Sequence, residues 1–181
     1  MLVLKSRIRV LVLPLFILMS MMGSLLQAQP ATTIDELLSK GVQEMQQTNH
    51  TKSLEILHHV RKMAQTKGTE KQLFLALNNI GANHFMMLDY GEALKYYLEA
   101  YAIAVKDLTY TDENIVLNNI AILYSKDKKW DKAEVYFLKA YQNAVDNTDD
   151  TKMQLNAINL AQLYNEMGKY NLSYDYLIKA K

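Results

Sequence analysis

The chain has 181 residues, of which 50% are hydrophobic, and its 20 basic and 19 acidic side chains give a formal net charge of +1. This near balance gives no reason to expect binding to nucleic acid or to anionic membranes. The sequence holds no cysteine, which excludes disulfides, thiol catalysis and cysteine-ligated zinc.

The first segment of the chain differs from the rest. Three basic residues up to Arg9 precede an apolar run over residues 10–22, and small residues follow up to Ala28. This order is typical of a secretory signal peptide. We therefore predict a signal peptide over residues 1–28, cleaved after Ala28, and export of the remainder to the periplasm or cell envelope.

An uncleaved N-terminal membrane anchor is the alternative interpretation of this segment. Its apolar character continues to Leu26, a larger residue than a cleavage site prefers. Either way, the rest of the chain is expected on the far side of a membrane. Without the segment's three basic residues, 17 basic side chains remain beside 19 acidic ones.

Residues 33–181 alternate apolar runs with short polar breaks. Within the runs, apolar residues recur at spacings of three and four, the pattern of amphipathic helices. Thr or Asp followed three residues later by Glu or Gln predicts several helix starts. The expected helices span 34–46, 52–67, 70–88, 90–106, 112–126 and 130–145, then one capped by Thr151 with Gln154 and one from about Tyr170.

The same pattern returns every forty residues. Residues 77–100, 117–140 and 157–180 superpose without a gap, and a weaker copy lies upstream. Small residues recur where two helix backbones would approach, and large residues recur where a side chain would fill the space between helices. The small columns are Gly81, Ala121 and Ala161, then Ala93, Ala133 and Ser173, then Ala100, Ala140 and Ala180; the large ones are Tyr90, Trp130 and Tyr170, then Tyr97, Phe137 and Leu177.

This order of small and aromatic columns resembles the tetratricopeptide repeat. The resemblance implies an all-α solenoid of helix-turn-helix units that bury their apolar faces by stacking. After the signal peptide, about 3.5 repeats are expected, with units over about 34–73, 74–113, 114–153 and the incomplete 154–181. The forty-residue period is similar to that of kinesin light chains and bacterial peptide-sensing regulators.

The chain stops at Lys181, inside the last expected helix, and leaves Leu177 and Ile178 without a following helix. Terminal repeats usually present a polar outer face. We therefore expect the sequence to be part of a longer protein, the alternative being a natural end with a frayed helix.

No group of residues predicts catalysis. Glu55, His58 and His59 lie near one another in sequence, but adjacent histidines point about 100° apart on a helix. They are interpreted as surface residues, and no metal, cofactor or enzymatic activity is expected within these repeats.

A column of asparagines is the leading candidate site. Asn79, Asn119 and Asn159 stand forty residues apart, with Asn78 and Asn118 beside two of them. An amide offers a donor and an acceptor to a peptide backbone, and the resemblance implies that the first helices line a concave groove. The alternative is that these amides tie one repeat to the next.

Other positions of the same groove follow from the alignment of the units. Phe85, Lys126 and Asn165 complete the predicted site. Further groove positions are Ala82, Met86, Ile122, Ser125, Gln162 and Glu166. Because Lys126 is the only basic residue among them, a clamp for a terminal carboxylate is not expected.

These features predict a non-enzymatic module that binds a protein or peptide segment. The resemblance suggests the sensory or scaffold part of a larger signalling protein, with a membrane-anchored continuation. A stand-alone envelope assembly scaffold and a repeat domain of an exported enzyme are the alternatives. No binding of nucleic acid, or of a membrane by the repeats themselves, is expected.

Overall fold

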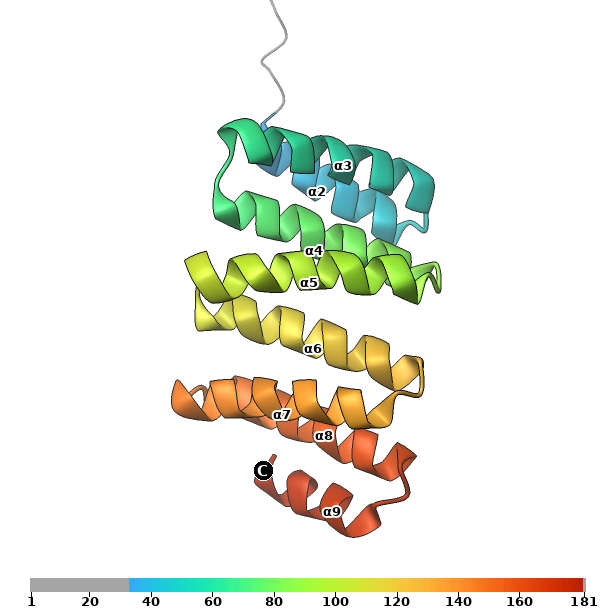
Figure 1. The fold of residues 1–181 in the computed structure, drawn as a ribbon, viewed down its shortest axis with the longest axis vertical. Helices are drawn as coiled ribbons and strands as arrows, with labels where there is room; N and C mark the ends of the chain where they lie inside the picture. Colours follow the sequence, from blue (N-terminus) through green and yellow to red (C-terminus); the bar gives the residue numbers. More distant parts are fainter. Residues whose placement is uncertain (1–32, 181) are drawn as a thin grey trace, which may run out of the picture. The chain divides into compact units, whose positions relative to one another are not determined.

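The computed structural model describes residues 33–180, and their ordered elements are all α-helices. The predicted all-α solenoid is therefore confirmed (Figure 1). The predicted signal peptide and its alternative, a membrane anchor, lie outside the described residues. The helices are α2 (Ile34–Gln46), α3 (His50–Lys67), α4 (Glu70–Met86), α5 (Tyr90–Asp107), α6 (Tyr110–Lys126), α7 (Trp130–Asp146), α8 (Asp150–Glu166) and α9 (Tyr170–Lys179).

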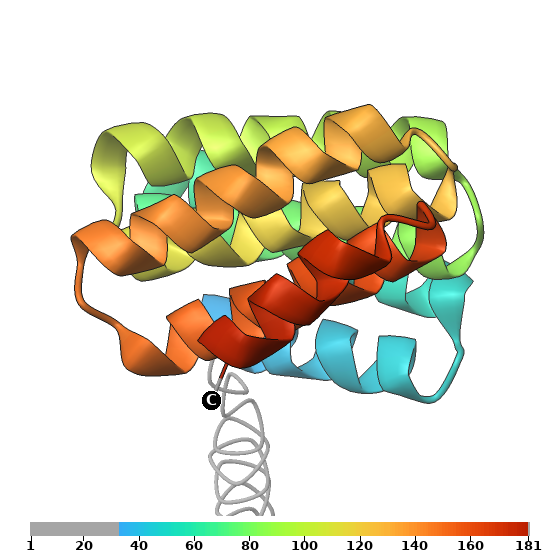
Figure 2. The ribbon, with the colours of Figure 1, turned by 90° about the horizontal axis from the view of Figure 1, so that it is seen from below.

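The helices form antiparallel pairs that stack along the long axis of the repeat array (Figure 1). Each helix packs against the next one in the chain, and α4 also contacts α2 and α6. We call α2, α4, α6 and α8 the A layer, and α3, α5, α7 and α9 the B layer. Viewed along the stack, α5 and α7 lie together on one side of α6 (Figure 2).

The helix starts follow the capping chemistry that the sequence predicts, with one exception. Thr33 with Glu36 and Thr69 with Gln72 form capping boxes, in which each side chain bonds the backbone N–H of the other residue. The predicted cap of α8 by Thr151 is wrong. Asp149 caps this helix instead, because its carboxylate accepts the Lys152 backbone N–H.

The turn inside each pair uses a left-handed residue in the same column. Thr48, Leu88, Lys128 and Gly168 have φ values of 62°, 62°, 56° and 74°. In each turn two backbone bonds close back on the preceding helix, as with Asp89 N–H to His84 C=O and Leu88 N–H to Phe85 C=O. This geometry ends α4 at Met86, two residues before the predicted end.

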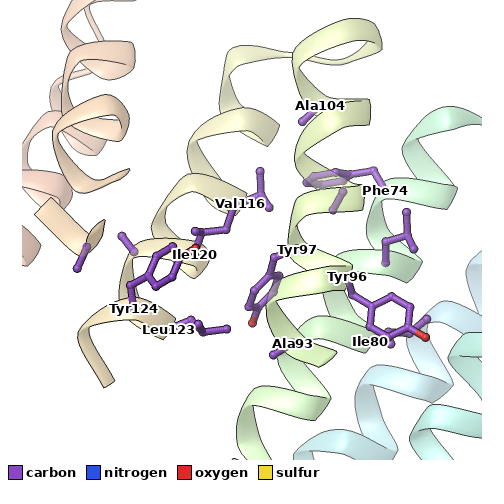
Figure 3. Packing of buried hydrophobic residues seen from close by; sticks show 14 of the residues in the cluster. Phe74, Ile80, Ala93, Tyr96, Tyr97, Ala104, Val116, Ile120, Leu123 and Tyr124 are labelled. Atoms are coloured by element: carbon purple, nitrogen blue, oxygen red, sulfur yellow. The ribbon is translucent and has the colours of Figure 1, made fainter. Parts of the chain in front are cut away.

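The predicted small columns let the two helices of a pair meet. Gly81, Ala121 and Ala161 are buried, as are Ala93 and Ala133 across from them. A Cβ atom on Gly81 would lie 2.7 Å from Cδ1 of Tyr97, so this aromatic ring packs directly on the glycine. Figure 3 shows Tyr97 of α5 beside Ile120 and Leu123 of α6. The ring therefore fills the space between one pair and the next.

The other aromatic column does not fill the core. Trp130 is 38% exposed and Tyr170 is 68% exposed, so the prediction that this column lies between the helices is wrong. These residues open α7 and α9 directly after the turns, where the edge of the array faces water. Tyr90 is half-buried because its ring packs on Phe85, with 5.7 Å between centroids.

The described array leaves one face uncovered. Leu177 shares a column with Tyr97 and Phe137, which are each 3% exposed, but Leu177 is 49% exposed. Within residues 33–180 no helix follows α9 to cover it. Among the same residues, no helix is both long and apolar enough to cross a bilayer.

Candidate functional site

The predicted site residues lie on α4, α6 and α8, all in the A layer. Asn79, Asn119 and Asn159 occupy the same position on their three helices and are half-buried. Each lies at the border between the buried and exposed sides of its helix, since the next residue, Ile80, Ile120 or Leu160, is fully buried and points about 100° away. The asparagine column therefore runs across three consecutive A-layer helices.

Two of these amides join consecutive helices. Asn119 Nδ2 donates to Asn78 Oδ1 at 2.8 Å, and Asn159 Nδ2 donates to Asn118 Oδ1 at 2.9 Å. Asn79 Nδ2 instead donates to the Leu75 carbonyl of its own helix at 2.7 Å. The column therefore ties repeats together through side-chain acceptors.

The same amides keep unused hydrogen-bonding capacity. An amide side chain has two N–H donors and a carbonyl oxygen that accepts. Among residues 33–180, no donor is bonded to Oδ1 of Asn79, Asn119 or Asn159. A structural role and a role in binding are therefore compatible in this column.

Asn118 differs from the other predicted site residues because it is only 8% exposed. Its Nδ2 bonds Asn156 Oδ1 at 2.7 Å and Asn114 Oδ1 at 3.1 Å. Asn114 and Asn156 both donate to the Ala140 carbonyl, at 2.7 and 2.9 Å. This buried network fixes the oxygen that holds Asn159, so Asn118 positions a residue of the predicted groove.

A pocket of about 160 Å³ opens between α6 and α8. It brings together the predicted site residues Lys126 and Asn159 with three neighbouring groove positions. Phe137 and Leu163, which the sequence pattern did not assign to the groove, are 3% and 1% exposed and provide its apolar base. The full lining is Ile122, Ser125, Lys126, Phe137, Asn159, Gln162 and Leu163.

The polar rim of this pocket is internally bonded. Ser125 Oγ donates to Glu166 Oε2 at 2.9 Å, and Gln162 Nε2 donates to Glu166 Oε1 at 3.4 Å. The Glu166 carboxylate thus accepts hydrogen bonds from two neutral side chains. Lys126 is exposed at the same rim.

The remaining predicted residues lie outside the pocket. Phe85 is half-buried against Tyr90 on the preceding pair, and Asn165 is exposed on α8. Asn78 is half-buried as the acceptor for Asn119. The structure thus groups Lys126 and Asn159 at one place and spreads the other residues along the A layer.

A column of exposed apolar residues on the A layer was not predicted from the sequence. Leu75, Ile115 and Leu155 stand forty residues apart, four positions before the asparagines. Ile115 is 42% and Leu155 52% exposed, and Leu75 is half-buried. The forty-residue spacing of these three residues could have revealed the column. It was overlooked because an apolar residue on an amphipathic helix is normally assigned to the core.

Three of the histidines contact side chains of neighbouring helices. His50 Nδ1 lies 2.7 Å from Asn83 Oδ1, and His58 and His84 pack on the Tyr96 ring with centroids 5.8 and 5.6 Å away. Across residues 33–180, no cluster of three or more His, Asp or Glu side chains could hold a metal ion.

Comparisons with known proteins find the same kind of helical repeat. Residues 34–106 match the family model described as "Tetratricopeptide repeat". No curated protein matches the sequence significantly.

Several solved structures share the fold at low sequence identity. BtubC (BKLC) from P. vanneervenii has a TM-score of 0.73 at 18% identity and is matched over 87% of this chain and 65% of its own. The STAND protein PH0952 from Pyrococcus horikoshii, with its tetratricopeptide repeat sensor, has a TM-score of 0.75 at 18% identity over 81% of this chain and 23% of its own. The Rap conjugation regulator of plasmid pLS20, in complex with the Phr* peptide, has a TM-score of 0.68 at 18% identity over 93% of this chain and 52% of its own.

These chains extend beyond the matched part, since this chain spans less than two thirds of each of the three. What they have in common with it is the helical repeat fold. Residues 34–106 thus match the tetratricopeptide repeat family, and the same forty-residue columns and helical repeat fold continue to α9.

Proposed function

We propose that the chain is a non-enzymatic module that binds an extended protein or peptide segment along its A layer. One observation carries this proposal: the pocket of about 160 Å³ between α6 and α8 lies beside the asparagine column and is open to a ligand. Asn159 belongs to both, so one bound segment would meet both features.

The two kinds of column in the A layer suit an extended segment. Asn79, Asn119 and Asn159 have carbonyl oxygens that accept no bond within residues 33–180, and these suit the backbone N–H groups of a segment regardless of its side chains. The apolar column of the half-buried Leu75 and the exposed Ile115 and Leu155 would bury apolar side chains of the same segment. Backbone contacts would give affinity, and apolar contacts would select among sequences.

We further propose that the module is exported and acts as the sensory or scaffold part of a larger signalling protein. The signal-peptide pattern over residues 1–28 supports export. A solved neighbour with a tetratricopeptide repeat sensor, and another bound to a peptide, support the sensory role by analogy of fold. A reporter enzyme that is active only outside the cytoplasm, fused after Lys181, tests export: an inactive fusion that accumulates at normal levels would contradict it.

A photo-crosslinking amino acid tests the binding face. Placed at Ile122, at the pocket wall, it should trap a partner in the native host, whereas at Val135 it should not. Val135 is the matched control because it is 62% exposed on α7, in the B layer. Crosslinks from Val135 and none from Ile122 would contradict binding on the A layer.

A further inference from the structure

The pocket between α6 and α8 has the size of a single hydrophobic side chain. Its volume is about 160 Å³, and an apolar protein cavity of about 150 Å³ is known to hold one benzene molecule. We propose that it receives one Leu, Ile, Met or Phe side chain of the bound segment, and that an acidic residue next to this anchor pairs with Lys126. The proposal rests on the proposed function and names its ligand chemistry.

The walls of the pocket support an apolar anchor. Phe137 and Leu163 lie at the base and are almost fully buried, and Ile122 forms part of the side. Ser125 and Gln162 already donate to Glu166, so these rim groups do not require a polar ligand group inside the pocket. A charged or amide side chain would lose its hydration against Phe137 and Leu163 at the base, which offer it no polar partner.

The charge of Lys126 is the reason to expect an acidic residue beside the apolar anchor of the bound segment. Within residues 33–180 the Lys126 ammonium makes no ion pair, whereas Lys129 pairs with Asp127 at 2.7 Å and Lys169 with Glu134 at 3.4 Å. Lys126 is thus an available cation at the pocket rim. An exposed ion pair of this kind adds little affinity and weakens with salt, so it selects the neighbour of the anchor without dominating binding.

The repeat suggests a variant that changes the pocket lining. In the preceding unit the position equivalent to Ser125 is Phe85, whose ring packs on Tyr90 of the same helix pair. Ser125 itself lines the pocket. A Ser125→Phe variant would therefore add to the pocket wall a side chain that the chain already accommodates forty residues upstream.

Selection of random displayed peptides tests this subsite. The wild-type protein should enrich peptides with a Leu, Ile, Met or Phe beside an Asp or Glu. Ser125→Phe should weaken binding of an enriched peptide by about tenfold or more, as expected for losing a buried side chain. Val135→Phe, which adds the same ring to an exposed position of α7 in the B layer, should leave it unchanged.

Lys126→Gln should weaken the same peptide by less than about fivefold, with the difference disappearing at high salt. Enriched peptides without the apolar–acidic pair, or equal binding by Ser125→Phe and the wild type, would overturn the subsite while leaving the groove intact. A wild-type protein that enriches no peptide would overturn the proposed function as well. Circular dichroism of both phenylalanine variants confirms that they are folded.

Discussion

The Asn119 side chain on α6 donates to Asn78 Oδ1 on α4 at 2.8 Å, so a side-chain amide links two consecutive repeats. Asn159 repeats the contact one unit later with Asn118, at 2.9 Å. The asparagine column is therefore part of the stacking interface as well as the proposed binding face. This double role makes stability and binding separable only by comparing positions within the column.

Asn119→Ala and Asn79→Ala should differ in their effect on stability. Asn119→Ala removes a bond between repeats and should lower the free energy of unfolding by about 1 kcal/mol. Asn79 bonds only the Leu75 carbonyl of its own helix, so Asn79→Ala should be nearly neutral, helped by the higher helix propensity of alanine. Urea unfolding measures both, and an equal loss at the two positions would show that the bond to Asn78 contributes nothing.

A buried polar chain joins the first three helices. Asn83 Nδ2 donates to Ser53 Oγ at 2.6 Å, and Ser53 Oγ donates to the Gly41 carbonyl at 2.7 Å. Leu123 and Leu163 follow Asn83 in its column, and Ala93, Ala133 and Ser173 follow Ser53 in its column. Ser53→Ala alone leaves a buried N–H of Asn83 unpaired, and should cost about 1 to 3 kcal/mol.

The double variant Ser53→Ala with Asn83→Leu removes both partners of that bond. Its loss should be smaller than the sum of the two single losses by about 1 kcal/mol or more, since no buried donor of Asn83 remains. A double-mutant cycle of unfolding free energies measures this coupling. Additive losses would mean that the two side chains do not depend on each other.

The left-handed turn residues predict opposite effects of substitution at two equivalent positions. Leu88 has φ 62° and is 73% exposed, so Leu88→Gly should stabilise the protein by about 1 kcal/mol. Gly168 has φ 74°, and a Cβ atom added there would meet no neighbouring group within 4 Å, so Gly168→Ala should cost a similar amount through backbone conformation alone. Melting temperatures that move in the same direction for both variants would contradict this account.

The two aromatic columns should differ in their contribution to stability. Phe137 is 3% exposed, and Phe137→Ala should cost about 3 to 5 kcal/mol. Trp130 is 38% exposed, and Trp130→Ala should cost only about 1 to 2 kcal/mol. Chemical denaturation measures the free energy of unfolding of both variants. A loss at Trp130 that equals or exceeds the loss at Phe137 would show that Trp130 is a core residue after all.

His58 should make the folded state sensitive to acid. Its ring meets Tyr96 edge-on, and burial, then Arg61, His84 and Lys95, hold the pKa of His58 below its usual value of 6.5. The unfolded chain therefore takes up this proton first, so the stability that His58 contributes above pH 6.5 is lost as the pH falls below it. The effect is small because His58 is only partly removed from water, which screens its interactions.

Unfolding curves between pH 7.5 and 5, a window about the reference pKa of 6.5, test this sign. His58→Asn should flatten the decline in stability, while His59→Asn, at the neighbouring exposed position, should keep it. A steeper decline in His58→Asn would reverse the sign of the argument.

Most of the fold could be predicted from the sequence because the small columns repeat with a fixed period. Gly81 and Ala121 mark where helices meet, and capping pairs such as Thr69 with Gln72 mark where they begin. The left-handed conformation of Leu88 was not predicted, since it comes from the surrounding turn bonds and not from a glycine. Trp130 was misassigned because helical periodicity does not tell an edge position from a core position.

The candidate site was less predictable. The asparagine column follows from sequence spacing, but its bonds to Asn78 and Asn118 depend on how neighbouring helices are offset. The pocket depends on Phe137, which comes from a B-layer helix and closes the base between two A-layer helices. The spacing of residues within one helix does not show which side chains of three different helices will meet at one pocket.

The most direct test of binding on the A layer compares one selected peptide on wild-type protein and on Asn119→Ala combined with Asn159→Ala. Each variant is measured below its melting temperature, with Asn171→Ala as the control at an exposed asparagine of the B layer. The account predicts about tenfold weaker binding by the double variant, the loss expected for two hydrogen bonds, and unchanged binding by the control. Equal affinity of the double variant and the wild type, per folded molecule, would show that the asparagine column serves only to join the repeats.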